Sequence, residues 1–185
     1  MMRETDRVWL AQMLILNITM KLLTVSALLC AMLGLTTAAG QHHVEKRAIC
    51  CPHGWNKYGY RCFRYYSNPL NWAEAQRACE SVNANLASVR NIRDYYFIRK
   101  VIYHATHANG ETWIGGSDGQ VERYWFWIDG TRFSYTRWCR TQPDNFSGNQ
   151  NCMTMNWLGK DCWDDQHCGI RHPYVCVKNM LSFLG

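Results

Sequence analysis

The sequence has little of what would mark several other classes of protein. Only 4 of its 185 residues are proline, and no proline-rich linker, internal repeat or low-complexity tract divides the chain. Its 20 lysines and arginines are scattered, so the net charge of +6 does not indicate nucleic acid as a partner. No motif resembles a nucleophile elbow. These absences favour one globular domain that is not an enzyme.

Cysteine, in contrast, is abundant, and ten cysteines in so short a chain call for an oxidising compartment. Residues 20–40, MKLLTVSALLCAMLGLTTAAG, show the basic residue, apolar stretch and small residues of a secretory signal peptide. The apolar stretch is too short for a membrane span. We therefore predict a secreted, extracellular protein with a signal peptide over residues 1–40, in which translation starts at Met20 or the first nineteen residues extend the signal.

A dibasic pair, Lys46-Arg47, follows the signal. It predicts removal of a short propeptide, residues 41–47, although an ordinary exposed basic pair is the alternative. The remaining residues 48–185 suit a single domain. Because Cys30 leaves with the signal, nine cysteines remain, and an odd number means that one is free or pairs with another molecule.

The residue pattern of the chain differs between its first and second halves. NWAEAQRACESV (71–82) predicts a helix, with Asn71 and Glu74 in a capping-box relation, and NIRDYYFIRKVIYHA (91–105) predicts a second one capped by Asn91. After Gly110, short aromatic or β-branched runs alternate with Gly, Asp and Asn, as in strands joined by turns. Helices first and strands later predict an α+β fold with antiparallel sheets.

Seven segments follow the order and spacing of a C-type lectin domain: CPHGWNKYGYRC (51–62), WAEAQRAC (72–79), WIGG (113–116), WFWIDG (125–130), QPD (142–144), WDD (163–165) and YVC (174–176). Each alone is a weak signal, but together they cover residues 50–178. The chain resembles this family, above all its small secreted fish lectins of the ladderlectin and nattectin type, which are similar to type II antifreeze proteins. The resemblance implies a C-type lectin-like fold with two helices, antiparallel sheets, and a long calcium-binding loop region held by disulfides.

The resemblance also implies four disulfides: Cys51–Cys62, Cys79–Cys176, Cys139–Cys162 and Cys152–Cys168. The third would tie together the two segments that carry the candidate ligands. Cys50 is left over. We interpret it as the site of an interchain disulfide in a homodimer, and a thiol capped by a small molecule is the alternative.

The candidate site is a calcium site. Calcium prefers carboxylate, amide and backbone carbonyl oxygens. The family's ligand positions fall here on Gln142, Asp144, Gln150, Asp164 and Asp165, and Pro143 would follow a cis peptide bond. A merely solvated polar loop is the alternative.

Two of these positions depart from the family pattern, because Gln150 stands where Glu is usual and Asp164 where Asn is usual. Together the exchanges offset each other, so that three carboxylates and two amides remain. Gln142 with Asp144, and Gln150 with Asp164, each supply one amide and one acid. Each of two sugar hydroxyls on the calcium would therefore find a hydrogen-bond donor and an acceptor. A site decayed at random would show no such balance.

The order Gln-Pro-Asp resembles the galactose-binding class, which places an aromatic ring where Phe146 stands. An incidental loop aromatic is the alternative. The expected sugar-binding residues are Gln142, Asp144, Phe146, Gln150 and Asp164. The expected partners are galactose-type glycans on glycoproteins or microbial surfaces, bound weakly per site and more tightly by a dimer, in innate defence.

Three further features bear on this interpretation. A glycan on Asn145, in the sequon Asn145-Phe146-Ser147, would crowd the ligand, so we expect little occupancy. His104 and His107 are better interpreted as a solvated pair than as a metal site. The rival functions are ice binding of the type II antifreeze kind, whose members carry adjacent cysteines where this chain has Asn151-Cys152, and calcium-independent binding of a protein, as in venom relatives.

Overall fold

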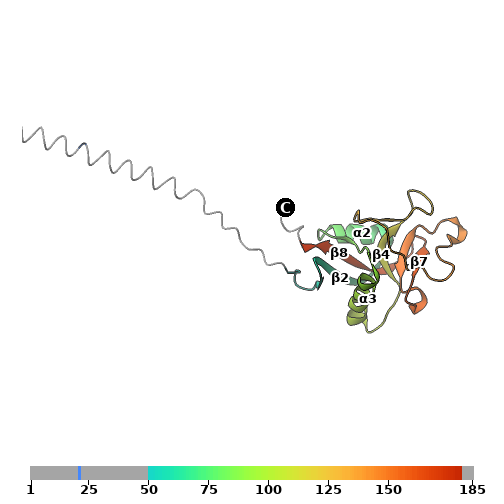
Figure 1. Cartoon of the computed structure of the whole chain (residues 1–185), viewed down its shortest axis with the longest axis horizontal. Helices are drawn as coiled ribbons and strands as arrows, with labels where there is room; N and C mark the ends of the chain where they lie inside the picture. Colours follow the sequence, from blue (N-terminus) through green and yellow to red (C-terminus); the bar gives the residue numbers. More distant parts are fainter. Residues whose placement is uncertain (1–20, 22–49, 181–185) are drawn as a thin grey trace, which may run out of the picture. The chain divides into compact units, whose positions relative to one another are not determined.

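The computed structural model describes Lys21 and residues 50–180 (Figure 1). The chain divides into two units, Met1–Arg47 and Ala48–Gly185. The expected signal peptide, start site and propeptide lie, apart from Lys21, outside the described residues, so these boundaries stay predictions. In the described part of the chain, no helix is long and apolar enough to cross a membrane.

An eight-stranded sheet forms the centre of the domain. Its strands are β1 (Asn56–Tyr58), β2 (Arg61–Leu70), β3 (Asn85–Leu86), β4 (Thr112–Ser117), β5 (Phe126–Trp127), β6 (Cys152–Met155), β7 (Trp163–Gln166) and β8 (His172–Asn179). Their order is β1-β2-β8-β4-β6-β7, with β3 paired to β8 and β5 to β4.

The sheet is mixed rather than purely antiparallel, because β4 and β8 run parallel while the other strand pairs are antiparallel. Parallel neighbours need a long connection. Here the whole segment that carries β5, β6 and β7 supplies it. The predicted order of helices first and strands later is wrong in part, because β1 and β2 precede α2 and β3 lies between the two helices. The sequence pattern also did not show which strands become neighbours, so the parallel pair was not predicted.

Two helices, α2 (Trp72–Glu80) and α3 (Ile92–Thr106), confirm the predicted ones. The side chain of Asn71 accepts from the Glu74 N–H, and the Glu74 carboxylate accepts from the Asn71 N–H, which completes the capping box. Asn91 caps α3 by accepting from the second and third N–H groups of its first turn. Helix α2 ends two residues before the predicted Val82, and the chain then turns at Asn83, which has a left-handed φ of 53°.

The helices cover opposite faces of the sheet, because successive residues of a strand point to opposite sides. On β8, Val175 and Val177 belong to the core that contains the buried face of α3, whereas Tyr174 and Cys176 belong to the core that contains α2. Figure 1 shows α2 and α3 on either side of β2, β8 and β4. The sheet therefore has two cores.

Four disulfides join the domain: Cys51–Cys62, Cys79–Cys176, Cys139–Cys162 and Cys152–Cys168. These are the pairs that the resemblance implies. Cys79–Cys176 links α2 to β8, and Cys139–Cys162 closes the loop segment onto the residue before β7. Cys50 is exposed and forms no disulfide within the described residues, so its interchain bond stays a prediction.

Trp163, the first residue of β7, is the centre of an aromatic cluster. It is fully buried, and four ring centroids lie 5.6 to 6.4 Å from its own, those of Trp127, Phe133, Tyr135 and Trp138. Its backbone also donates to the Arg137 carbonyl and accepts from the Cys139 N–H, at 2.8 and 2.9 Å. This packing fixes the start of β7, and with it the position of the next two residues, Asp164 and Asp165.

We expect Trp163→Leu to lower the free energy of unfolding by about 2–4 kcal/mol, because the indole fills space that the leucine would leave empty. Tyr124→Leu is the matched control, since Tyr124 is 67% exposed. Its effect should stay within about 0.5 kcal/mol. Urea unfolding with the disulfides intact measures both, and equal losses would contradict the role assigned to Trp163.

Candidate functional site

The segment between Cys139 and β6 forms an irregular loop. The Gln142–Pro143 peptide bond is cis, and the Gln142 N–H donates to the Cys139 carbonyl at 3.0 Å. A single turn of 3₁₀-helix, η1 (Phe146–Gly148), follows. The loop has no regular backbone ladder, so side chains supply much of its hydrogen bonding.

Asp165 of β7 anchors this loop. Its carboxylate accepts from the backbone N–H groups of Asp144 and Asn145, at 3.1 and 2.7 Å. Asp165 is buried, so these charge-assisted hydrogen bonds lie in a medium of low polarity. The two candidate ligand segments, QPD and WDD, are thereby held together although Asp144 and Asp165 are 21 positions apart in the chain.

Asp144 and Gln150 meet at a second point. Both accept from the Phe146 N–H, at 3.2 Å for the Asp144 carboxylate and 2.6 Å for the Gln150 amide oxygen. The Gln150 N–H in turn donates to the Asn145 side chain at 2.9 Å. Three of the five candidate ligands, Asp144, Gln150 and Asp165, therefore surround the same few backbone atoms.

Gln142 and Asp164 carry the oxygens that lack a partner. Asp164 is 2% exposed; its Oδ2 accepts from the Gln166 side chain, while Oδ1 is buried without a hydrogen-bond donor. The Oε1 atom of Gln142 is also buried and without a donor. Neither residue hydrogen bonds to another candidate ligand in the part of the chain that the structure describes. A buried oxygen without a partner is costly, so both oxygens are suited to an external electropositive group.

The electrostatics of the site point the same way. Burial raises the pKa of Asp164 to about 7; the Gln166 hydrogen bond opposes this shift, and the carboxylates of Asp165, Glu111 and Asp144 add to it. Burial also raises the pKa of Asp165, against the effect of the two backbone N–H groups that it binds. When Asp164 and Asp165 are ionised, their negative charge is buried where water screens it poorly. A bound cation would lower the electrostatic cost of this burial.

Asp118 is a further acidic residue of this region that the sequence reasoning missed. It directly follows β4, is buried, and has an Oδ1 atom without a donor, while Oδ2 accepts from the Arg123 N–H at 2.8 Å. Its own N–H donates to the carbonyl of Asn151, which follows Gln150. An acid directly after the buried run TWIGGS was the available signal, because a strand end often presents side chains to a site.

The donor set fits calcium, which is bound by carboxylate and amide oxygens. Across the described residues, no three His, Cys, Asp or Glu side chains gather as a metal cluster, so a cation here would depend on the amide oxygens of Gln142 and Gln150 as well. His104 and His107 are both exposed.

Phe146 forms an apolar rim beside these oxygens. Its side chain is 72% exposed, while its N–H is held by Asp144 and Gln150. The ring therefore stands in solvent next to the candidate ligands. The low glycan occupancy expected at Asn145 stays a prediction.

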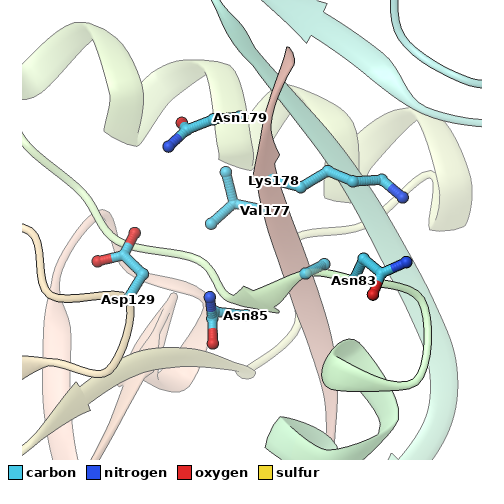
Figure 2. A pocket seen from close by; sticks show the side chains of 7 residues that line it. Asn83, Asn85, Asp129, Val177, Lys178 and Asn179 are labelled. Atoms are coloured by element: carbon cyan, nitrogen blue, oxygen red, sulfur yellow. The ribbon is translucent and has the colours of Figure 1, made fainter. Parts of the chain in front are cut away.

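A hollow elsewhere in the domain is less suited to a ligand. Figure 2 shows Asp129, Asn85 and Asn179 around it, with Lys178 extending to the other side of β8. Asp129 already accepts from the Ser88 hydroxyl and the Thr131 N–H, and Asn85 from Gln76. Because these polar groups serve the fold, the hollow is not a comparable site.

Comparison with known proteins agrees with this architecture. The lectin C-type domain family matches residues 68–178. Ladderlectin of Oncorhynchus mykiss is 35% identical over 182 residues, covering 87% of this chain and 96% of its own. The galactose-specific lectin nattectin of Thalassophryne nattereri is 37% identical, over 75% of this chain and 87% of its own. A type-2 ice-structuring protein of Osmerus mordax is 38% identical, over 82% and 89%.

The similar solved structures include both antifreeze proteins and lectins. A type II antifreeze protein of herring superposes with a TM-score of 0.65 at 36% identity, covering 70% of this chain and 98% of that one. The C-type lectin CEL-I of Cucumaria echinata gives a TM-score of 0.65 at 25% identity, covering 69% and 96%. The domain match, the relatives and the folds agree, and the chain belongs to the C-type lectin domain family.

Proposed function

We propose that this protein is a secreted, calcium-dependent lectin that binds galactose-type glycans. The observation that carries the proposal is the pair of buried oxygens without donors, Gln142 Oε1 and Asp164 Oδ1, in a region already rich in buried carboxylates. Calcium would be held by Gln142, Asp144, Gln150, Asp164 and Asp165. Bound there, it would supply a Lewis-acidic centre to which sugar hydroxyls can coordinate.

The side chains of this chain would orient the sugar. A carboxylate can only accept a hydrogen bond, whereas an amide can donate and accept. Gln142 with Asp144, and Gln150 with Asp164, each offer both functions, so two neighbouring hydroxyls of a hexose would each find a donor and an acceptor. Compared with the usual family pattern, the second pair has exchanged its roles but lost neither function.

The exposed ring of Phe146 would contact the apolar face of the sugar. Nattectin, which is similar to this chain, is described as a galactose-specific lectin, and this supports a galactose-type ligand here. A phenyl ring offers less contact area than an indole, so we expect weak binding per site. A homodimer through Cys50 would raise the apparent affinity by presenting two sites.

Ice binding is the second candidate, because similar chains include several type II antifreeze proteins. One of those solved structures is described as calcium-dependent and another as calcium-independent. The protruding Phe146 fits a flat ice surface poorly. A thermal-hysteresis assay on the same sample separates the two functions, since a lectin of this kind should show none while it is retained on galactose-agarose and released by EDTA.

We expect Asp164→Asn to weaken calcium binding roughly tenfold, because it leaves two carboxylates where three now stand. Adding Gln150→Glu restores the charge and should return the affinity to near the starting value. Calorimetric titration with calcium measures all three proteins. If Gln150→Glu with Asp164→Asn binds no better than Asp164→Asn alone, the two positions do not compensate each other.

Calcium affinity should fall as the pH is lowered through about 7, the pKa of Asp164. The raised pKa means that the calcium-free fold holds a proton that calcium must displace. For the same reason, this group stabilises the calcium-free fold fully below the ordinary aspartate pKa of 3.8, and that contribution is lost as the pH rises through about 7. Titrations at several pH values test this, and Asp164→Asn should show a flatter dependence near neutrality.

Phe146→Ala should weaken galactose binding about three- to tenfold and leave calcium affinity unchanged, because it removes only the apolar contact. Phe146→Trp should bind more tightly than the starting protein. Leu158→Ala is the matched control, since Leu158 is an exposed apolar residue of another loop. Retention on galactose-agarose is the measurement, and equal retention of all four proteins would exclude Phe146 from the sugar site.

A further inference from the structure

A basic groove lies between β1–β2 and the C-terminal half of α3. It is outside the candidate calcium loop, which is the segment between Cys139 and β6. It consists of two adjoining hollows of about 270 and 230 Å³ that share Asn56, Val101 and His104. Arg64 lines the first hollow, and Lys57 and Lys100 line the second. Four basic residues, counting His104, therefore line the groove, and no acidic residue does.

The sequence around the groove explains this one-sided charge. Residues 50–73, which include β1 and β2, contain no Asp or Glu. Asp94 is the one acid of α3, and it is fully buried, where it accepts from Arg61 and Arg90. Neither Arg64 nor Lys100 forms an ion pair with a carboxylate among the residues that the structure places. The charges of Arg64 and Lys100 are therefore available to an anionic ligand.

The positive charge extends beyond the groove. Burial, and then the neighbouring guanidinium of Arg64, lower the pKa of Lys178 on β8. Arg64 lies over the ring of Tyr66 at 5.0 Å, and Lys178 over that of Trp55 at 4.2 Å. Aromatic faces thus support these cations in place while leaving them charged.

The groove and the calcium loop lie at opposite edges of the sheet. In the order β1-β2-β8-β4-β6-β7, β1 borders the groove, and β7 carries Asp164 and Asp165. Five strand spacings of about 4.8 Å separate the two edges, which places the sites about 24 Å apart. A ligand in the groove would therefore need no calcium and would not displace a sugar from the loop.

We propose that this groove binds the sulfate groups of a sulfated polysaccharide, independently of calcium. Lys57 and Lys100 line one hollow, Arg64 lines the other, and His104 lines both, so basic side chains occur along the groove, which suits anionic groups spaced along a linear chain. The amide of Asn56 lines both hollows and can bind hydroxyl groups between them. The aromatic residues of the lining, Tyr65 and Phe97, are half-buried, so the groove offers no exposed platform for nucleic-acid bases.

The test is binding to an immobilised heparin oligosaccharide in EDTA at physiological ionic strength, about 0.15 M. The protein should bind, and the oligosaccharide should fail to bind it once desulfated. Arg64→Gln with Lys100→Gln should weaken binding roughly tenfold or more, because two charge contacts with the polyanion are lost. Arg93→Gln with Arg132→Gln removes the same charge from exposed positions outside the groove and should change the affinity less than about twofold.

Several outcomes would overturn the proposal. Equal losses in the two double variants would mean that only net charge matters. Tighter binding to a single-stranded oligonucleotide or to anionic vesicles would assign the groove to another class of partner. If Arg64→Gln proves unstable by circular dichroism, Lys57→Gln with Lys100→Gln serves instead. Galactose retention in calcium should be unchanged in all groove variants, so failure of this proposal and failure of the calcium-site proposal are separate results.

Discussion

The packing of Trp163 against four aromatic rings is the interaction on which the candidate calcium loop depends. It buries the first residue of β7 and closes the Arg137–Cys139 segment against it through two backbone hydrogen bonds. Asp165, two residues later, then binds the backbone of Asp144 and Asn145. An irregular loop with little regular structure of its own thus has a defined position, because a rigid aromatic core lies directly behind it.

This arrangement carries an electrostatic cost that also gives the site its chemistry. Asp118, Asp164 and Asp165 are buried close to the loop, and burial raises the pKa of each. Among the described residues none of the three forms an ion pair with a basic side chain, so they are suited to an external cation. Near the β1 edge of the sheet, the basic residues Arg64 and Lys100 line the groove. The strand order therefore separates an acidic edge from a basic one, and each edge is suited to a different kind of ligand.

The family shows that one scaffold can serve several functions. Relatives of similar identity are described as galactose-specific, as ice-structuring, and in one case as calcium-independent. Helices and core strands cannot separate these functions, because solved structures of both kinds share the fold. Function is instead decided by the residues of a site, and in the proposed site of this chain the exchange at Gln150 and Asp164 would keep the balance of acids and amides.

The sequence by itself determined the features that depend on near neighbours in the chain: both helices with their asparagine caps, the presence of strands after Gly110, and, through the family motifs, the disulfide pairs. Only the tertiary structure decided which strands run parallel, which oxygens of Gln142 and Asp164 lack a donor, that Asp118 lies beside the loop, and that Lys57 and Lys100 share a groove. The reason is physical. Caps and periodicity act over a few residues, whereas burial and charge pairing join residues far apart in sequence, which become neighbours only when the chain has folded.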